Sequence, residues 1–259
     1  MIYFFIVLCA NVIGAISGMG GGVIIKPVLD ALGRSTLLAI NFYSSFAVFI
    51  MSIVSTYKQA KNGIDIEWGE ALRLAIGSVI GGYLGNVLLV WLTHILNNDH
   101  LVNIIQIILL IITLILALIF TRPLHLKFSQ GMKLSLLFGS GIVLGLLATL
   151  LGIGGGPINV ALLISVFSFA PKSATTFSII TIFFSQISKL AGSIPMLDEM
   201  QISGLILIFI LCSAVLGGYC GAVLSHKLSS KHVLILYRIT VLGVIILNVV
   251  NGLKLLILA

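Results

Sequence analysis

Four long stretches of this chain contain no lysine, arginine, aspartate or glutamate. They cover residues 35–57, 74–98, 101–121 and 200–225. A helix needs about 20 predominantly apolar residues to cross a bilayer, so each stretch predicts one membrane span. Residues 172–193 and 232–258 predict two more, because basic side chains near their ends can reach the headgroups. With 59% hydrophobic and 8% charged residues, the expected fold is an all-α polytopic membrane protein without a soluble domain.

Two other apolar stretches, residues 1–32 and 134–170, are longer than one span needs. Each is interrupted by a run of glycines, GMGGG at 18–22 and GIGGG at 152–156. Glycine is unfavourable inside a helix, so both stretches are predicted to be broken helices.

The glycine runs lie 134 residues apart, and a second motif recurs after each of them, as GGYLG and then as GGYCG. These recurrences predict two homologous halves, each with one glycine-broken, re-entrant helix and three transmembrane helices. The predicted units are an N-terminal transmembrane repeat at 1–121, a cytoplasmic connector at 122–132 and a C-terminal transmembrane repeat at 133–259.

The basic residues bear on the topology, because short cytoplasmic loops are enriched in lysine and arginine. If the broken stretches cross the membrane fully, there are eight spans, and the basic residues divide eight against six. If each stretch enters and returns as a hairpin, ten lie on the connector's side and four on the other. The ten are Lys58, Lys61, Arg73, Arg122, Lys127, Lys133, Lys172, Lys227, Lys231 and Arg238. The larger bias favours re-entrant hairpins in halves of opposite orientation, and the eight-span topology stays open.

The glycine runs are also candidates for an anion site. Residues 20–22 and 154–156 can each end a helix inside the membrane and leave bare amides at the start of the next one. Bare amides at a helix N-terminus attract anions. Close helix packing is the alternative, and it is preferred for GGYLG and GGYCG because of their GxxxG spacing. Three consecutive glycines favour the anion site, since each costs about 1 kcal/mol in a helix interior.

Lys26 is the charged residue that most directly suggests binding, because it follows the first glycine run and an intramembrane cation is commonly functional. Snorkelling of Lys26 to an interface is an equal alternative. Lys189 is interpreted as a helix-end anchor. Asn159 falls in the first turn of a half-helix, where Pro157 fits the first helical position.

The remaining candidates are polar side chains that suit a desolvated oxyanion. Each hydroxyl can instead bond to its own helix backbone, and Gln186 can pair with another helix. The predicted substrate-binding residues are Gly20, Gly21, Gly22, Lys26, Asn41, Ser44, Ser45, Gly154, Gly155, Gly156, Asn159, Thr175, Thr176, Ser178 and Gln186.

Other function classes find no support in the sequence. No HExxH, GxSxG or GxxxxGK[ST] motif occurs, and the five histidines lie at loop edges. Cys9, Cys212 and Cys220 lie in apolar stretches and predict neither a disulfide framework nor a zinc site. We therefore expect no catalytic residue, metal or cofactor and no nucleic-acid partner. The expected partners are a small anionic substrate and the lipid bilayer.

The seven acidic residues are expected in loops or at helix ends, because a carboxylate in hydrocarbon is costly. No carboxylate is therefore expected at mid-span to relay protons. The N-terminus lacks the basic region and cleavage site of a secretory signal, and we expect it to be a retained membrane segment.

The chain resembles the TauE/SafE family of sulfite and organosulfonate exporters, which is also grouped with the toluenesulfonate-uptake permeases. The resemblance rests on the glycine run at 18–22 with Pro27, on its second copy, on the serine- and threonine-bearing start of the following span, and on GGYxG. It implies a polytopic plasma-membrane permease for sulfur-containing or related organic anions. The sequence departs from the family pattern at 41–43, where Asn-Phe-Tyr replaces a small hydroxyl pair, and at Ala161, which replaces a proline.

The function predicted from these features is secondary transport of a small anion by alternating access, with the anion held at the paired N-termini of the broken helices. An anion channel with the same pore residues is the main alternative.

Overall fold

The fold is described by a computed structural model that covers residues 1–62, 67–126, 128–153, 155–197, 200 and 202–258. Within these ranges the chain forms ten α-helices and one short 3₁₀ turn, and no β-strand is found there. The helices are α1 (Ile2–Ser17), α2 (Gly22–Leu32), α3 (Leu37–Lys61), α4 (Trp68–Leu96), α5 (Asp99–Ile119), α6 (Gln130–Leu150), α7 (Gly156–Ser165), α8 (Pro171–Ser193), α9 (Gly204–Lys227) and α10 (Ser230–Leu258).

Seven of these helices are long and apolar enough to cross a membrane, namely α3, α4, α5, α6, α8, α9 and α10. Six of the seven coincide with the six predicted spans, and the all-helical, multi-pass membrane class is confirmed. The seventh is α6, which belongs to the stretch predicted to be broken by the second glycine run.

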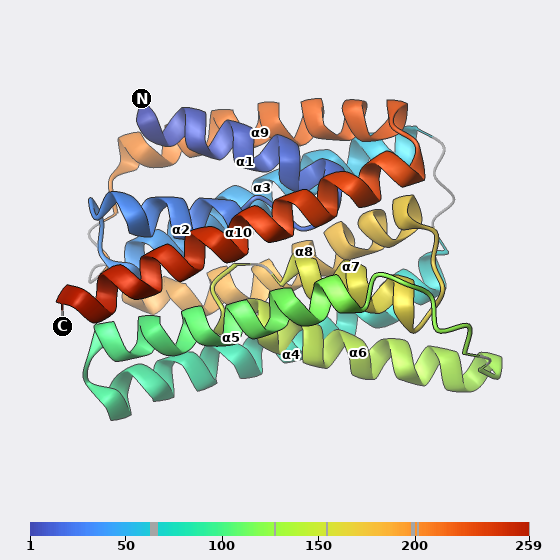
Figure 1. The fold of residues 1–259 in the computed structure, drawn as a ribbon, viewed down its shortest axis with the longest axis horizontal. Helices are drawn as coiled ribbons and strands as arrows, with labels where there is room; N and C mark the ends of the chain where they lie inside the picture. Colours follow the sequence, from blue (N-terminus) through green and yellow to red (C-terminus); the bar gives the residue numbers. More distant parts are fainter. Residues whose placement is uncertain (63–66, 127, 154, 198–199, 201, 259) are drawn as a thin grey trace.

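Helices α1 and α2 form a hairpin, because the start of α1 lies beside the residues that follow α2. The Tyr3 hydroxyl and Ser35 Oγ are 2.8 Å apart. Helices α6 and α7 form a second hairpin, since the connector that precedes α6 lies beside the end of α7: the Leu124 amide donates to the Ser165 carbonyl at 2.8 Å. Figure 1 shows the first hairpin at the end that holds both chain termini and the second at the opposite end. We call these the terminal end and the connector end. Entry of the hairpins into the bilayer from opposite sides stays a prediction.

Each hairpin turns at its glycine run. Gly18 caps α1 with a φ of 73° and Gly152 follows α6 with a φ of 73°, in the left-handed region that favours glycine. Pro157 lies at the start of α7, as predicted. Gly154, one of the predicted site residues, lies outside the described residues.

The GGYxG glycines let helices pack closely. An added Cβ on Gly81 of α4 would lie 2.9 Å from Ile142 Cα of α6. A Cβ on Gly221 of α9 would lie 2.7 Å from the Val12 carbonyl oxygen of α1. The packing interpretation of GGYLG and GGYCG is confirmed at these positions.

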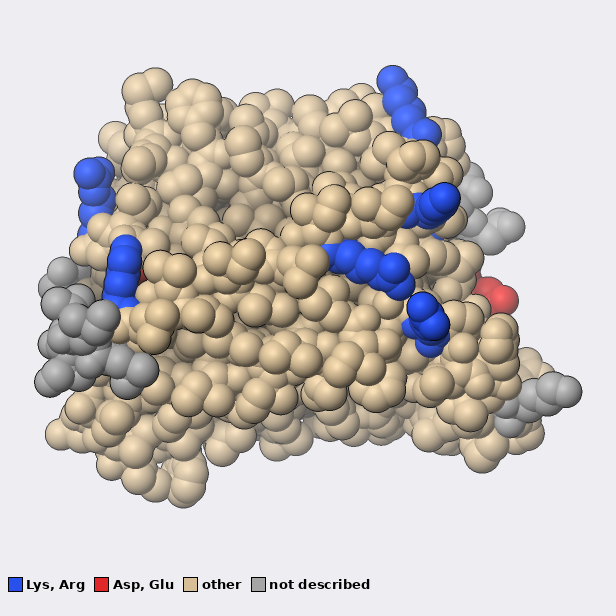
Figure 2. Space-filling view, viewed as in Figure 1, with Lys and Arg blue, Asp and Glu red and all other residues tan. Residues whose placement is uncertain are grey.

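Asp30 and Glu70 lie at helix ends, as expected, although both are inside helices and not in loops. Asp30 lies within α2, and Glu70 is buried in the first turn of α4. Glu70 forms an ion pair with Lys133 of α6, which offsets the cost of burying its charge. Asp65, Asp198 and Glu199 lie outside the described residues. In the view of Figure 2, lysine and arginine lie toward the two ends, with uncharged surface between them.

Candidate functional site

The two helix breaks lie against each other. An added Cβ on Gly22, the first residue of α2, would be 2.7 Å from the Ile153 carbonyl oxygen of the second break. An added Cβ on Gly156, the first residue of α7, would overlap the Met19 carbonyl of the first break. The structure therefore brings the starts of α2 and α7 together, although their sequences are far apart.

Serine hydroxyls from α3 and α8 hold the starts of the two short helices. Ser178 Oγ donates to the Gly18 carbonyl of the first break at 2.6 Å and lies 3.5 Å from the Gly156 carbonyl oxygen. Ser44 Oγ donates to the Gly22 carbonyl at 3.5 Å. Both predicted hydroxyls are therefore at the breaks, where they position backbone.

The start of α2 carries amides without partners inside the helix. Ile24 and Ile25 both donate to the Gly21 carbonyl, at 3.0 and 2.9 Å. The amides of Gly22 and Val23 come before them, and the first amides of a helix have no intrahelical acceptor. Helix α7 has fewer such donors, because Pro157 carries no N–H group.

Lys26 is buried, with 2% of its surface exposed, so it does not snorkel to an interface. Its Nζ donates to Gln106 Oε1 of α5 at 2.8 Å. Gln106 Nε2 in turn donates to the Leu150 carbonyl at the end of α6, at 2.7 Å. This chain of hydrogen bonds links α2, α5 and the second break around one positive charge.

Lys189 is also buried, with 3% of its surface exposed, and its Nζ has no hydrogen-bond partner among the described residues. The interpretation of Lys189 as a helix-end anchor is wrong, because its side chain is buried in the protein although it is near the end of α8. Lys189 lies on the face of α8 that includes Ile182, and Ile182 packs against Gly20 of the first break. Within the described part of the chain, neither Lys26 nor Lys189 forms a salt bridge.

Buried amide side chains without partners surround the same region. Both polar atoms of the Gln186 side chain lack a partner within the described residues, and Gln186 shares a face of α8 with Lys189. Asn41 Oδ1 also has no partner among the described residues. It lies against the position that a Cβ on Gly152 would occupy, at the second break. Asn159 Oδ1 and both polar atoms of Asn11 complete the group. A buried polar group without a partner costs about 1–3 kcal/mol, so such a group points to a ligand or water.

Three of the predicted hydroxyl groups donate hydrogen bonds to backbone or side-chain oxygens of the protein. Ser45 Oγ donates to the Asn41 carbonyl, and Thr175 Oγ1 to the Lys172 carbonyl, each at 2.7 Å on its own helix. Thr176 Oγ1 donates to Gln59 Oε1 of α3 at 2.5 Å. For Ser45 and Thr175 these bonds favour the alternative of a bond to their own helix backbone, whereas Thr176 also bonds to a neighbouring helix.

The other predicted glycines form the breaks themselves. Gly20 has a φ of 71° and packs against α3 and α8, and Gly21 precedes α2. Gly155 precedes α7 with a φ of 68°. An added Cβ on Gly21 would overlap the Asn11 side chain. The side-chain amide of Asn11, from α1, therefore lies at the first break.

Gln106, Asn11 and Lys189 are residues that sequence reasoning missed or interpreted differently. Gln106 did carry a signal, because it is a lone amide in the apolar run 104–112. Asn11 carried a similar one in the first helix. The pairing of Gln106 with Lys26 joins residues 80 positions apart, and no local pattern predicts it.

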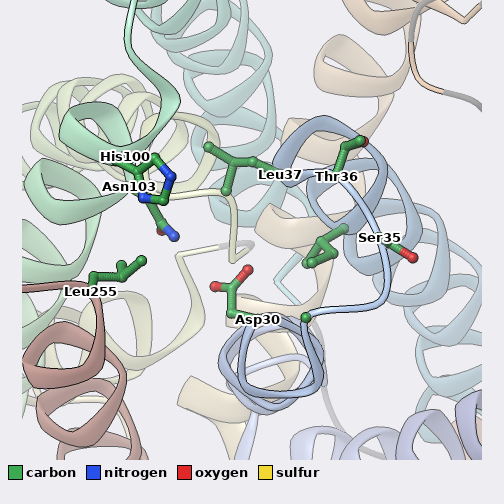
Figure 3. Close-up of a pocket in the computed structure, with 9 residues that line it drawn as sticks. Asp30, Ser35, Thr36, Leu37, His100, Asn103 and Leu255 are labelled. Atoms are coloured by element: carbon green, nitrogen blue, oxygen red, sulfur yellow. The ribbon is translucent and has the colours of Figure 1, made fainter. Parts of the chain in front are cut away.

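A pocket of about 350 Å³ lies at the terminal end. Figure 3 shows the Asp30 carboxylate directed into it, with His100 and Asn103 on the opposite wall. Asp30 is one turn of α2 beyond Lys26, and Asn103 is one turn of α5 before Gln106. The pocket is therefore one helical turn from the Lys26 hydrogen bond.

Comparison with known proteins decides the family. The sequence model described as "Sulfite exporter TauE/SafE" matches residues 3–250. The chain belongs to the TauE/SafE family. No solved structure matches it.

Two curated members of the same TauE/SafE group are similar over nearly their whole length. "Probable membrane transporter protein YunE" of Bacillus subtilis is 24% identical over 257 residues, covering 91% of this chain and 92% of that protein. "Probable membrane transporter protein MJ0441" of Methanocaldococcus jannaschii is 26% identical over 247 residues, covering 90% and 89%. This TauE/SafE chain is accordingly a multi-pass membrane transporter.

Proposed function

We propose that this TauE/SafE protein is a secondary transporter of the plasma membrane that binds a small sulfur-containing or related organic anion where its two helix breaks meet. The observation that carries the proposal is a pair of buried lysines, Lys26 on the helix that starts at the first break and Lys189 on the helix that packs against it, both without a salt-bridge partner among the described residues. A buried cation without a counter-ion is costly, and an anion removes that cost. The description of the family as sulfite exporters agrees with this class of substrate.

Alternating access depends on a second proposal. In it, the two halves are inverted repeats, and their hairpins re-enter the membrane from opposite sides. The same contact occurs in both halves: Ser44 lies beside Gly22 in the first, and Ser178 lies beside Gly156 in the second. The two contacts are separated along the chain by the same distance as the glycine runs. The two hairpins also begin at opposite ends of the molecule in Figure 1. One half moving against the other would then expose the breaks to each side in turn.

Both ends of the molecule have a pocket that such a cycle would open and close in turn. At the terminal end, the pocket is lined by Asp30, which is one turn of α2 from Lys26. At the connector end, Lys133 pairs with Glu70 and lies 5.3 Å from the centre of the Phe169 ring. These three residues line a pocket of about 160 Å³ at that end.

The orientation makes a labelling prediction, because the excess of basic residues places the connector end in the cytoplasm. In a background with Cys9, Cys212 and Cys220 changed to serine, we compare Arg34→Cys with Lys231→Cys. A membrane-impermeant maleimide is expected to label Arg34→Cys in intact cells and Lys231→Cys only after permeabilisation. Both wild-type side chains are exposed, so accessibility does not limit either reaction. The reverse pattern would invert the orientation, and labelling of both in intact cells would refute the proposed topology.

Counterflow in proteoliposomes tests the transport mechanism against the channel alternative. Vesicles are loaded with unlabelled sulfite or sulfoacetate, and uptake of the radiolabelled anion is followed without a gradient of total substrate. A carrier is expected to accumulate label transiently, because internal substrate speeds the return of the binding site. Label that only equilibrates, at a rate unaffected by internal anion, would establish a channel. No uptake of any tested sulfur oxyanion or organosulfonate would contradict the substrate class.

A further inference from the structure

We infer that Lys189 supplies the second positive charge of the anion site, so that the site selects doubly charged oxyanions over singly charged ones. This inference rests on the proposed function and names the substrate class more narrowly. It begins from the isolation of Lys189, which is buried in α8 without any partner among the described residues. Lys26, by contrast, already donates to Gln106.

The local charges favour a dianion. Asp30 lies one turn from Lys26 on α2, forms no salt bridge with it among the described residues, and directs its carboxylate into the pocket at the terminal end (Figure 3). Lys189 has no comparable carboxylate partner in the described ranges. A singly charged ligand would leave one buried ammonium uncompensated, whereas a doubly charged ligand compensates both.

The donors near Lys189 favour a ligand with several oxygen acceptors. Each lysine ammonium carries three N–H donors, and one of those on Lys26 is already used by Gln106. The Gln186 amide, one turn before Lys189 on the same face of α8, adds two more donors that have no acceptor among the described residues. A compact oxyanion with three or four oxygens can accept from this many donors, and a halide cannot.

Matched pairs of anions test the selectivity on purified wild-type protein by isothermal titration calorimetry at pH 8. The pairs are sulfate with methanesulfonate, and sulfite with methanesulfinate, in which a methyl group replaces one charged oxygen at similar size. In at least one pair, wild-type protein is expected to bind the dianion about tenfold or more tightly than its partner. Lys189→Gln is expected to lose most of that preference by weakening dianion binding, and Lys189→Arg to keep it.

Two controls separate this role from a structural one. Lys254→Gln removes one exposed positive charge near the end of α10 and is expected to bind like wild type. Without any anion, Lys189→Gln is expected to melt at the same or a higher temperature, since an unpaired buried charge is removed. A lower melting temperature together with unchanged selectivity would assign Lys189 to the fold.

The outcomes distinguish the two proposals. Equal binding of both members of each pair by wild-type protein, or an unchanged preference in Lys189→Gln, would overturn the assignment of Lys189 and leave the anion site at Lys26 standing. Binding of none of the four probes by wild-type protein would overturn the proposed function, and this inference with it.

Discussion

Gly156→Val is expected to abolish counterflow, because its side chain would enter the contact between the two helix breaks. Even a Cβ at this position overlaps the Met19 carbonyl of the other break, and a backbone atom cannot rotate away. We expect the variant's free energy of unfolding to fall by about 3 kcal/mol or more, which is the upper end of the range for overpacked substitutions. The breaks must then separate, which removes the arrangement on which the anion site depends. Counterflow and the melting temperature of purified protein measure the two effects.

Gly139→Val is the matched control for this variant. Gly139 lies on α6, in the same hairpin as Gly156, but it is exposed, and no atom lies within 4 Å of an added Cβ. Its counterflow and melting temperature are expected to stay near those of wild type. Normal counterflow by Gly156→Val would show that contact between the breaks is not needed for transport.

Lys26→Met is expected to weaken binding of the transported anion by about 10- to 100-fold. A hydrogen bond to a charged group contributes about 1.5–3 kcal/mol, and methionine keeps the side-chain length without the charge. The measurement is the dissociation constant of the anion by calorimetry, on protein whose melting temperature confirms folding.

Gln106→Leu separates the charge of Lys26 from its hydrogen bond to α5. This variant removes the neutral acceptor of Lys26 and leaves the ammonium in place. Its anion affinity is expected to fall less than that of Lys26→Met, because the freed N–H group can donate to the ligand. An unchanged affinity in Lys26→Met would assign Lys26 to linking α2, α5 and α6, with no contact to the anion.

The spans could be predicted because burial in lipid constrains composition along the whole helix. Stretches without charge coincide with α3, α4, α5, α9 and most of α8 and α10. The positions of the breaks could be predicted as well, since glycine runs are disfavoured in helices. Helix α6 is long and apolar enough to cross the membrane and ends at Leu150 in the second break, so its re-entry stays a prediction.

The depth of the lysines could not be predicted, because it depends on how distant helices pack. Lys26 could have reached an interface if α2 lay differently, and its acceptor comes from α5. Lys189 lies near the end of an apolar run, which resembles an anchor, but its surroundings bury it. The pairing of Glu70 with Lys133 likewise joins α4 to α6 across the connector, beyond any helical spacing.

The central claim is that an anion binds between Lys26 and Lys189, where the helix breaks meet. The most direct measurement is an anomalous difference map, at the selenium edge, from crystals of methionine-containing protein grown with selenite, the heavier analogue of sulfite. We predict one peak within hydrogen-bonding distance of Nζ of both lysines. Selenium density only at the outer surface, or no density near either lysine at saturating selenite, would contradict the claim.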